Sequence, residues 1–308
     1  MFQLLSTFII YITIFLFGMT VMKIGFKNIS EVRIRQILFH MTDRPIKGIL
    51  VGTLLTAILQ SSSVVTVIVI SLTMSNLLLF RQTIGVILGA NIGTTVTGLI
   101  ASFDGGTFKY VLLAIGVFFI FLPFRKLFAL GTVFFGIGCI FISMDGFNTL
   151  AEPLKSISYI QNILIVVNHS IGAGVLFGAL CSAIIQSSSA TILIAMGFIN
   201  HDSLTLTSAL SIMLGANIGT CMTAILACIN SNPAGRWTAY THTLFNVLGA
   251  VLFLPFLPMF AHFISQLSPA PDTQLAYGSI LFNVITALLA LPLVHAYGQW
   301  VENRMKLN

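Results

Sequence analysis

The segments ILQSSSVVT (Ile58 to Thr66) and IIQSSSATI (Ile184 to Ile192) each place one amide and three consecutive hydroxyls inside otherwise apolar sequence. Around them, only 7% of the 308 residues are charged and 57% are hydrophobic. Such a composition predicts that most of the chain faces lipid and that the protein is integral to a membrane. The two QSSS segments are the exceptions to this composition, and they decide the fold and the function that we expect.

The QSSS segments belong to a duplication. Residues 48–102 align with residues 174–228 without a gap, and 21 of the 55 pairs are identical, including QSSS and GANIGT. Looser similarity between FGMTVMKIGF and GCIFISMDGF, and two copies of FLPF, extend the repeated unit to about 120 residues. We therefore expect a single transmembrane domain over residues 1–308, made of repeat 1 (7–125), repeat 2 (131–258) and a final transmembrane helix (276–298).

Each QSSS segment is expected at the tip of a re-entrant helical hairpin. Gly48 to Leu59 is an apolar stretch of 12 residues, which as a helix spans about 18 Å of a hydrocarbon core of about 30 Å. Non-helical backbone at that depth is tolerated only where it is buried in protein or lines a watery cavity. The predicted fold class is an all-α membrane protein with about seven full spans plus two hairpins, and a site at the hairpin tips.

A repeat with three full spans and one re-entrant hairpin crosses the membrane an odd number of times, so the two repeats should have inverted topology. With the N-terminus outside and the C-terminus in the cytoplasm, 12 of the 14 Lys and Arg positions, Lys23 among them, fall on the inner face. Only Lys109 and Lys155, together with Asp104 and Glu152, fall outside. This orientation explains the net charge of +6 without a nucleic-acid partner.

The protein is expected in the cell inner (plasma) membrane as a multi-pass protein. The first apolar run, Thr7 to Met22, has neither a basic segment before it nor a small-residue cleavage site after it. It is therefore expected to remain as a span and not to be removed as a signal peptide.

The hairpin tips can bind ions of both signs. A new half-helix is expected to begin near Ser63 or Val64 and near Ser189 or Ala190, and its first amides suit an anion. Serine hydroxyls suit a tetrahedral oxyanion, because each donates a short hydrogen bond without adding a fixed charge. The carbonyls that end the preceding half-helices suit a cation. Inverted repeats with broken helices are the architecture of secondary transporters.

Further cation ligands are expected beside the tips. Gln60 and Gln186 each offer a side-chain carbonyl. The glycines of the GANIGT copies should loosen their helices and expose carbonyls beside four polar residues, which would form the opposite wall of a sodium site: Asn91, Thr94, Asn217 and Thr220. Both motifs have a plainer explanation, because hydroxyls and small residues in membrane helices also serve helix packing.

Other polar residues carry weaker signals. Asp145 is either a functional carboxylate or an interfacial one. Asn246 and Asn283, each within the tripeptide LFN, are candidates for capping or cross-linking helices. The histidines His169, His242 and His295 lack metal-like spacing, and the four cysteines behave as small apolar residues.

Four motifs in order, LFGM, the duplicated QSSS, the duplicated GANIGT and RWTAYTHTLFN, resemble the bacterial branch of the type II sodium-phosphate cotransporter family. The resemblance implies sodium-coupled symport of inorganic phosphate by an elevator-like or related alternating-access cycle, with Na⁺ as the coupling ion. It implies phosphate ligands at both tips: Ser61, Ser62, Ser63, Ser187, Ser188 and Ser189. It implies that the sodium ligands lie among Gln60, Gln186, Asn91, Asn217, Thr94, Thr220 and Thr191.

The sequence departs from the family pattern in three places. The first QSSS continues with Val64 and Val65 where the second has Ala190 and Thr191, which puts a sodium ligand on that side in doubt. Cys221 stands where the first GANIGT copy is followed by threonine. Many bacterial relatives carry a soluble PhoU-like domain after the transporter, so regulation of this chain is expected to come from elsewhere.

Three other functions remain open at this point. The cargo could be another oxyanion such as sulfate or arsenate, because hydroxyls and helix ends recognise geometry and charge. The chain could be a phosphate sensor or scaffold that binds without transport. An intramembrane serine hydrolase is disfavoured, because no lysine follows a motif serine at the required spacing and no histidine has a reason to face one, so the chain is not expected to be an enzyme. The expected partners are phosphate, sodium and the lipid bilayer, and a homodimer is compatible with the sequence.

Overall fold

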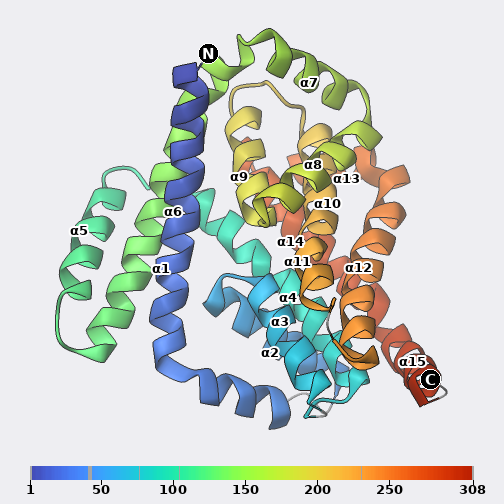
Figure 1. Ribbon diagram of the computed structural model, residues 1–308. Helices are drawn as coiled ribbons and strands as arrows, with labels where there is room; N and C mark the ends of the chain where they lie inside the picture. The colour runs from blue at the N-terminus through green and yellow to red at the C-terminus, as the bar shows by residue number, and fades with distance from the viewer. Residues whose placement is uncertain (1, 41–43, 76, 104, 230, 307–308) are drawn as a thin grey trace.

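Figure 1 shows the fold of the chain as a computed structural model, which describes residues 2–40, 44–75, 77–103, 105–229 and 231–306, without the side chains of 26–40 and 306. Within these ranges every regular element is helical. The elements are α1 (Phe2–His40), α2 (Pro45–Leu59), α3 (Ser62–Met74), α4 (Phe80–Ala101), α5 (Phe108–Ile120), α6 (Arg125–Lys155), α7 (Ser158–His169), α8 (Ile171–Ile185), α9 (Ser188–Ile199), α10 (Leu206–Gly219), α11 (Cys221–Ala227), α12 (Pro233–Phe253), η1 (Leu254–Phe256), α13 (Leu257–Ser265), α14 (Pro271–Ala290), η2 (Leu291–Leu293) and α15 (Val294–Lys306).

Six helical stretches of the described residues are long and apolar enough to cross a membrane, which confirms an all-α membrane protein. They are Phe2–Gly25, Phe80–Ala101, Arg125–Lys155, Leu206–Ala227, Pro233–Ser265 and Pro271–Met305. The seventh expected span corresponds to α5, whose 13 residues reach only about 20 Å as a helix. Helices dominate because a backbone in lipid must satisfy its hydrogen bonds within its own segment.

The two repeats run in opposite directions. In Figure 1, α1 descends from the N-terminus and α6 ascends beside it, while the α2–α3 hairpin lies at the lower end of the molecule and the α8–α9 hairpin at the upper end. Likewise α4 runs upward and α10 downward. The arrangement agrees with the inverted topology predicted from the odd number of crossings.

In each repeat, the first helix of the hairpin packs closely on the helix that carries GANIGT. A Cβ added at Gly89 would lie 2.0 Å from the carbonyl oxygen of Ile49 in α2, and one added at Gly215 would lie 1.9 Å from that of Val175 in α8. Such backbone-to-backbone contact is possible only for small residues. The glycines therefore serve packing, and α4 continues without a break to Ala101, so the loosened helix expected beside Asn91 is wrong. In the second copy α10 ends at Gly219 and α11 begins at Cys221.

Two further expectations differ from the structure. α1 does not end near Met22 but continues to His40, although its apolar span ends at Gly25, so Lys23 lies within a helix but close to the end of the span. A separate helix, α7, precedes the second hairpin and lies across the top of the molecule in Figure 1. Asp104 lies outside the described residues, as do the side chains of Lys27, Arg33 and Arg35, so their assigned faces stay predictions.

Candidate functional site

The tips of the two hairpins meet in one pocket. It has a volume of about 280 Å³ and is lined by residues of both repeats. The lining residues are Leu16, Met19, Thr20 and Lys23 of α1, Gln60, Ser61, Ser62 and Ser63 of the first tip, Gln186, Ser187, Ser188 and Ser189 of the second tip, and Thr94 and Thr220. All six serines, both glutamines and both GANIGT threonines singled out from the sequence are thus brought together. Asn91, Asn217 and Thr191 are not among the lining residues.

The backbone of each tip turns through a left-handed residue. Gln60 has φ 50° and Gln186 has φ 57°, and each ends its half-helix in this conformation. A left-handed residue other than glycine costs about 1–2 kcal/mol, so such positions persist where the surrounding structure demands them. Both copies have glutamine at this position, although glycine would adopt the same conformation without strain. We therefore infer that the glutamine side chain itself has a function.

The first serine of each tip caps the following half-helix. The Ser61 hydroxyl accepts a hydrogen bond from the amide of Val64 at 3.4 Å, and the Ser187 hydroxyl accepts one from Ala190 at 3.2 Å. α3 therefore begins at Ser62 and α9 at Ser188, about one residue before the predicted starts. The two amides before the capped one in each half-helix, those of Ser62 and Ser63 and of Ser188 and Ser189, have no acceptor within the helix.

Three serine hydroxyls of the tips are available to a ligand. Ser62, Ser188 and Ser189 are buried and line the pocket, yet their hydroxyls have no hydrogen-bond partner among the described residues. These hydroxyls are not among the buried side-chain atoms of the described residues that lack a partner, so they are accessible from the pocket. Together with the free amides they form a set of neutral donors from both repeats, which suits an oxyanion.

Two threonines that sequence reasoning missed hold the first tip in place. The Thr97 hydroxyl of α4 donates to the side-chain carbonyl of Gln60 at 2.5 Å, and the Thr223 hydroxyl of α11 lies 3.1 Å from the Ser63 hydroxyl. The second contact joins repeat 2 to repeat 1. Thr97 and Thr223 occupy aligned positions, three residues after the end of each GANIGT, and that identity was the available signal.

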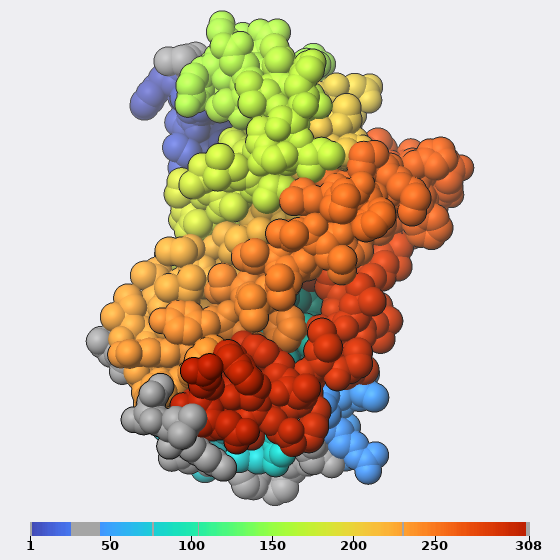
Figure 2. Space-filling model, turned by 90° about the vertical axis from the view of Figure 1, so that its right-hand side faces the viewer, coloured from blue at the N-terminus to red at the C-terminus, as the bar shows by residue number. Residues whose placement is uncertain are grey.

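Asn91 faces another helix and not the pocket. Its Oδ1 accepts from Nε2 of His242 at 3.3 Å, and its Nδ2 donates to Oδ1 of Asn246 at 3.1 Å, both on α12. Asn246 in turn donates to the backbone carbonyl of His242 at 2.9 Å, which closes the network. The predicted role of Asn246 as a cross-link between helices agrees with these contacts. Behind the network lies a pocket of about 140 Å³, visible in Figure 2 as a hollow between orange α12 and red α14.

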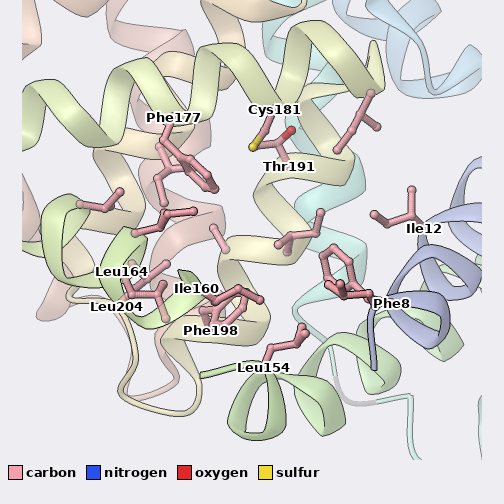
Figure 3. A pocket seen from close by; sticks show the side chains of 17 residues that line it. Phe8, Ile12, Leu154, Ile160, Leu164, Phe177, Cys181, Thr191, Phe198 and Leu204 are labelled. Carbon is pink, nitrogen blue, oxygen red and sulfur yellow. The ribbon is translucent and has the colours of Figure 1, made fainter. Parts of the chain in front are cut away.

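Thr191 lies in the wall of a different cavity. Figure 3 shows it beside Cys181, in an apolar cavity of about 190 Å³ that also includes Phe177 and Phe198. Its hydroxyl donates to the carbonyl oxygen of Ser187 at 3.1 Å. Asn217 is also buried away from the polar pocket, where its amide contacts the sulfur of Met213 at 3.7 Å. The ligand roles of Thr191, Asn91 and Asn217 stay predictions that this arrangement does not favour.

The second tip has a side-chain oxygen atom that is available to bind a cation. Gln186 is exposed to the pocket and its side chain has no hydrogen bond among the described residues, unlike Gln60. The hydroxyls of Thr94 and Thr220 face the same pocket. Side-chain carbonyl and hydroxyl oxygens are suitable ligands for a hard cation. Asp145, by contrast, forms an ion pair with Lys109 and lies outside the pocket.

Lys23 brings a positive charge to this site. It lies on α1, partly buried, and is the one ionisable residue among the described residues that line the pocket. The sequence placed it on the inner membrane face because charge next to an apolar run usually marks a helix end. Lys23 lies two residues before the end of the apolar span Phe2–Gly25 and also lines the pocket with the tips, so its membrane face stays a prediction.

Comparison with known proteins agrees with this geometry. The sequence pattern of the Na+/Pi-cotransporter family matches the chain twice, over residues 14–149 and 146–294. The chain is 42% identical over 274 residues to the uncharacterized protein YqeW of Bacillus subtilis, which covers 89% of each chain. No solved structure matches the chain.

Two relatives have names that refer to phosphate. The chain is 27% identical over 259 residues to a Salmonella typhimurium protein named "Putative inorganic phosphate export protein YjbB", covering 83% of this chain but 48% of that one. It therefore spans about half the length of YjbB. Over 60 residues it is 45% identical to the human "Sodium-dependent phosphate transport protein 2B", which is 20% of this chain and 9% of the relative.

Proposed function

The chain belongs to the Na+/Pi-cotransporter family, and from this membership and the pocket between the hairpin tips we propose that it is a sodium-coupled symporter of inorganic phosphate. Phosphate would bind between the two QSSS tips, and sodium would bind beside them. Alternating access would expose this one site to each side of the membrane in turn.

The observation that carries the proposal is the convergence of both tips on one pocket. Six serines, the free amides that begin α3 and α9, and the amide side chains of two glutamines surround about 280 Å³. Neutral donors that converge from two repeats suit a tetrahedral oxyanion that must also be released. Family membership favours phosphate over sulfate or arsenate, which the same donors would also accept.

Sodium would bind through oxygen atoms that lie beside these donors. Gln186, Thr94 and Thr220 present such oxygens to the pocket, whereas the carbonyl of Gln60 already accepts from Thr97. A sodium ion next to the anion would offset part of its charge, which couples the binding of the two. We therefore place the coupling ion nearer the second tip than the first.

The direction of net transport depends on the gradients in this proposal. A symporter carries phosphate inward when the sodium gradient points inward, and the same cycle runs outward when phosphate is concentrated inside. The name of YjbB refers to export. Both directions are therefore included in the test.

The test uses purified protein in liposomes. Uptake of radiolabelled phosphate is measured with an inward sodium gradient and with potassium in place of sodium, and efflux is measured from phosphate-loaded vesicles. We expect uptake that requires sodium and that is lost in the double variant Ser62→Ala plus Ser188→Ala. The matched control is Ser71→Ala plus Ser75→Ala, two exposed serines of the first hairpin that lie outside the pocket.

Two results would redirect the proposal. Movement of sulfate or arsenate but not phosphate would preserve the site and change the cargo. Phosphate binding without uptake or efflux under either gradient would favour a sensor or scaffold.

A further inference from the structure

We propose that Lys23 binds the anion directly, so that its ammonium provides the fixed positive charge of the phosphate site. The inference rests on the proposed function, because it assumes that the pocket between the tips holds phosphate. It adds a phosphate-binding residue that lies in neither QSSS nor GANIGT.

The position of Lys23 follows from helix periodicity. Leu16, Met19, Thr20 and Lys23 are spaced three, one and three residues apart, so they form one face of α1. All four line the pocket with the two tips. Lys23 therefore reaches the site from a helix that belongs to neither hairpin.

The surroundings of Lys23 contain no group that balances its charge. A lysine in a membrane helix ordinarily extends to the interface or pairs with a carboxylate. Lys23 has no hydrogen bond or ion pair among the described residues, and no carboxylate lies among those that line the pocket. A partly buried ammonium that shares a pocket with three serine hydroxyls without partners would be completed by an anion.

The ammonium would contribute a positive charge, which the two tips lack. Serine hydroxyls and backbone amides are neutral donors, and hydrogen bonds from a charged donor to an anion are about twice as strong. The effect is asymmetric between the repeats, because the position that corresponds to Lys23 in the similarity of 17–26 to 138–147 is Met144, which is buried.

The experiment measures equilibrium binding of radiolabelled phosphate to the purified full chain in detergent, at a fixed sodium concentration. Loss of a hydrogen bond to a charged group corresponds to about 10- to 100-fold in affinity, so Lys23→Met and Lys23→Gln should each weaken phosphate binding by about that factor. Lys23→Arg, which retains the charge, should stay within about threefold of the wild type.

The control is Lys126→Met, which removes one charge from the exposed first turn of α6 and should leave phosphate binding unchanged. Elution volume and melting temperature establish that each variant is folded, and two neutral variants guard against the failure of one. Wild-type-like affinity in Lys23→Met or Lys23→Gln would overturn the inference while leaving the proposed function intact. A wild type that binds no phosphate would overturn the proposed function and this inference with it.

Discussion

The two hairpin tips have the same four residues and nearly the same backbone, but their side chains have different surroundings. Gln60 and Gln186 differ in φ by only a few degrees, at 50° and 57°. Yet Gln60 is 7% exposed and accepts a hydrogen bond from Thr97, whereas Gln186 is exposed. An identical sequence therefore determines the turn, while neighbouring helices determine which side chains remain free for a ligand.

The difference extends beyond the tips. Asn91 of the first GANIGT is held by His242 and Asn246, whereas Asn217 of the second contacts a methionine sulfur. In transporters with inverted repeats, one repeat moves against the other around a fixed site. The proposed cycle would therefore allow the two tips to have different surroundings in one state. The following predictions test which parts of the two repeats are equivalent and which are not.

The largest effect is expected where the repeats are equivalent. Gly89→Ala and Gly215→Ala each place a Cβ within about 2 Å of a backbone carbonyl oxygen in the neighbouring helix, so each should destabilise the protein by about 3 kcal/mol or more. The readout is the melting temperature of the purified protein in detergent.

The matched control for both glycines is Gly172→Ala in α8, where the nearest atom to the new Cβ is 3.9 Å away. That change should be neutral or stabilise by up to about 1 kcal/mol. If either Gly89→Ala or Gly215→Ala melts like the wild type, the close packing of α2 on α4 and of α8 on α10 is not equivalent.

A smaller effect should separate Asn91 from Asn217. Asn91→Leu removes the partner of His242 Nε2 and of Asn246 Oδ1, so we expect a loss of about 2–4 kcal/mol. Asn217→Leu removes only a weak contact to sulfur and should cost about 1 kcal/mol or less. Melting temperatures of the two variants are compared directly, and equal losses would show that the network on α12 adds nothing to stability.

Substitution of the aligned threonines should also destabilise the protein more in repeat 1 than in repeat 2. Thr97→Val keeps the shape of the side chain but leaves the buried carbonyl of Gln60 unpaired, which costs about 1–3 kcal/mol. Thr223 is half-buried, so Thr223→Val should cost less than about 1 kcal/mol. A larger loss at Thr223 would mean that its contact with Ser63 between the repeats is the stronger of the two.

The sequence was sufficient to predict the hairpins, because two copies of four polar residues in apolar sequence allow few arrangements in a membrane. The starts of α3 and α9 lie about one residue before the predicted ones, whereas the meeting of the two tips in one pocket was inferred from the symmetry of the repeats and not from these residues. The inverted arrangement follows from the sequence, because it depends only on counting crossings.

The sequence could not predict which face of a helix meets which neighbour. Lys23 was assigned to the inner membrane face because its charge borders an apolar run, and that pattern did not reveal that Lys23 also lines the pocket. Thr191 and Asn91 were grouped with the site by motif, although one faces an apolar cavity and the other faces α12. Thr97 was missed because a threonine in an apolar helix ordinarily bonds to its own backbone.

The smallest effects on stability are expected for substitutions of the two left-handed glutamines. They test the comparison of the two tips most directly. Gln186→Gly relieves a left-handed residue but makes the unfolded chain more flexible, so it should stabilise the protein by at most about 1 kcal/mol. Gln60→Gly also loses the hydrogen bond from Thr97 and should instead destabilise by about 1 kcal/mol. Melting temperatures should therefore move in opposite directions for the same substitution.

Transport supplies the second readout for these glutamines. Under the proposed function both variants lose sodium-driven phosphate uptake, because each removes an oxygen or amide from the pocket. Asp202→Gly is the control, since Asp202 has φ 51° but lies outside the pocket, and it should gain stability while keeping full uptake. If Gln186→Gly gains stability and also keeps full uptake, the glutamine at this left-handed position has no functional role. The proposal that sodium binds beside the second tip would then be wrong as well.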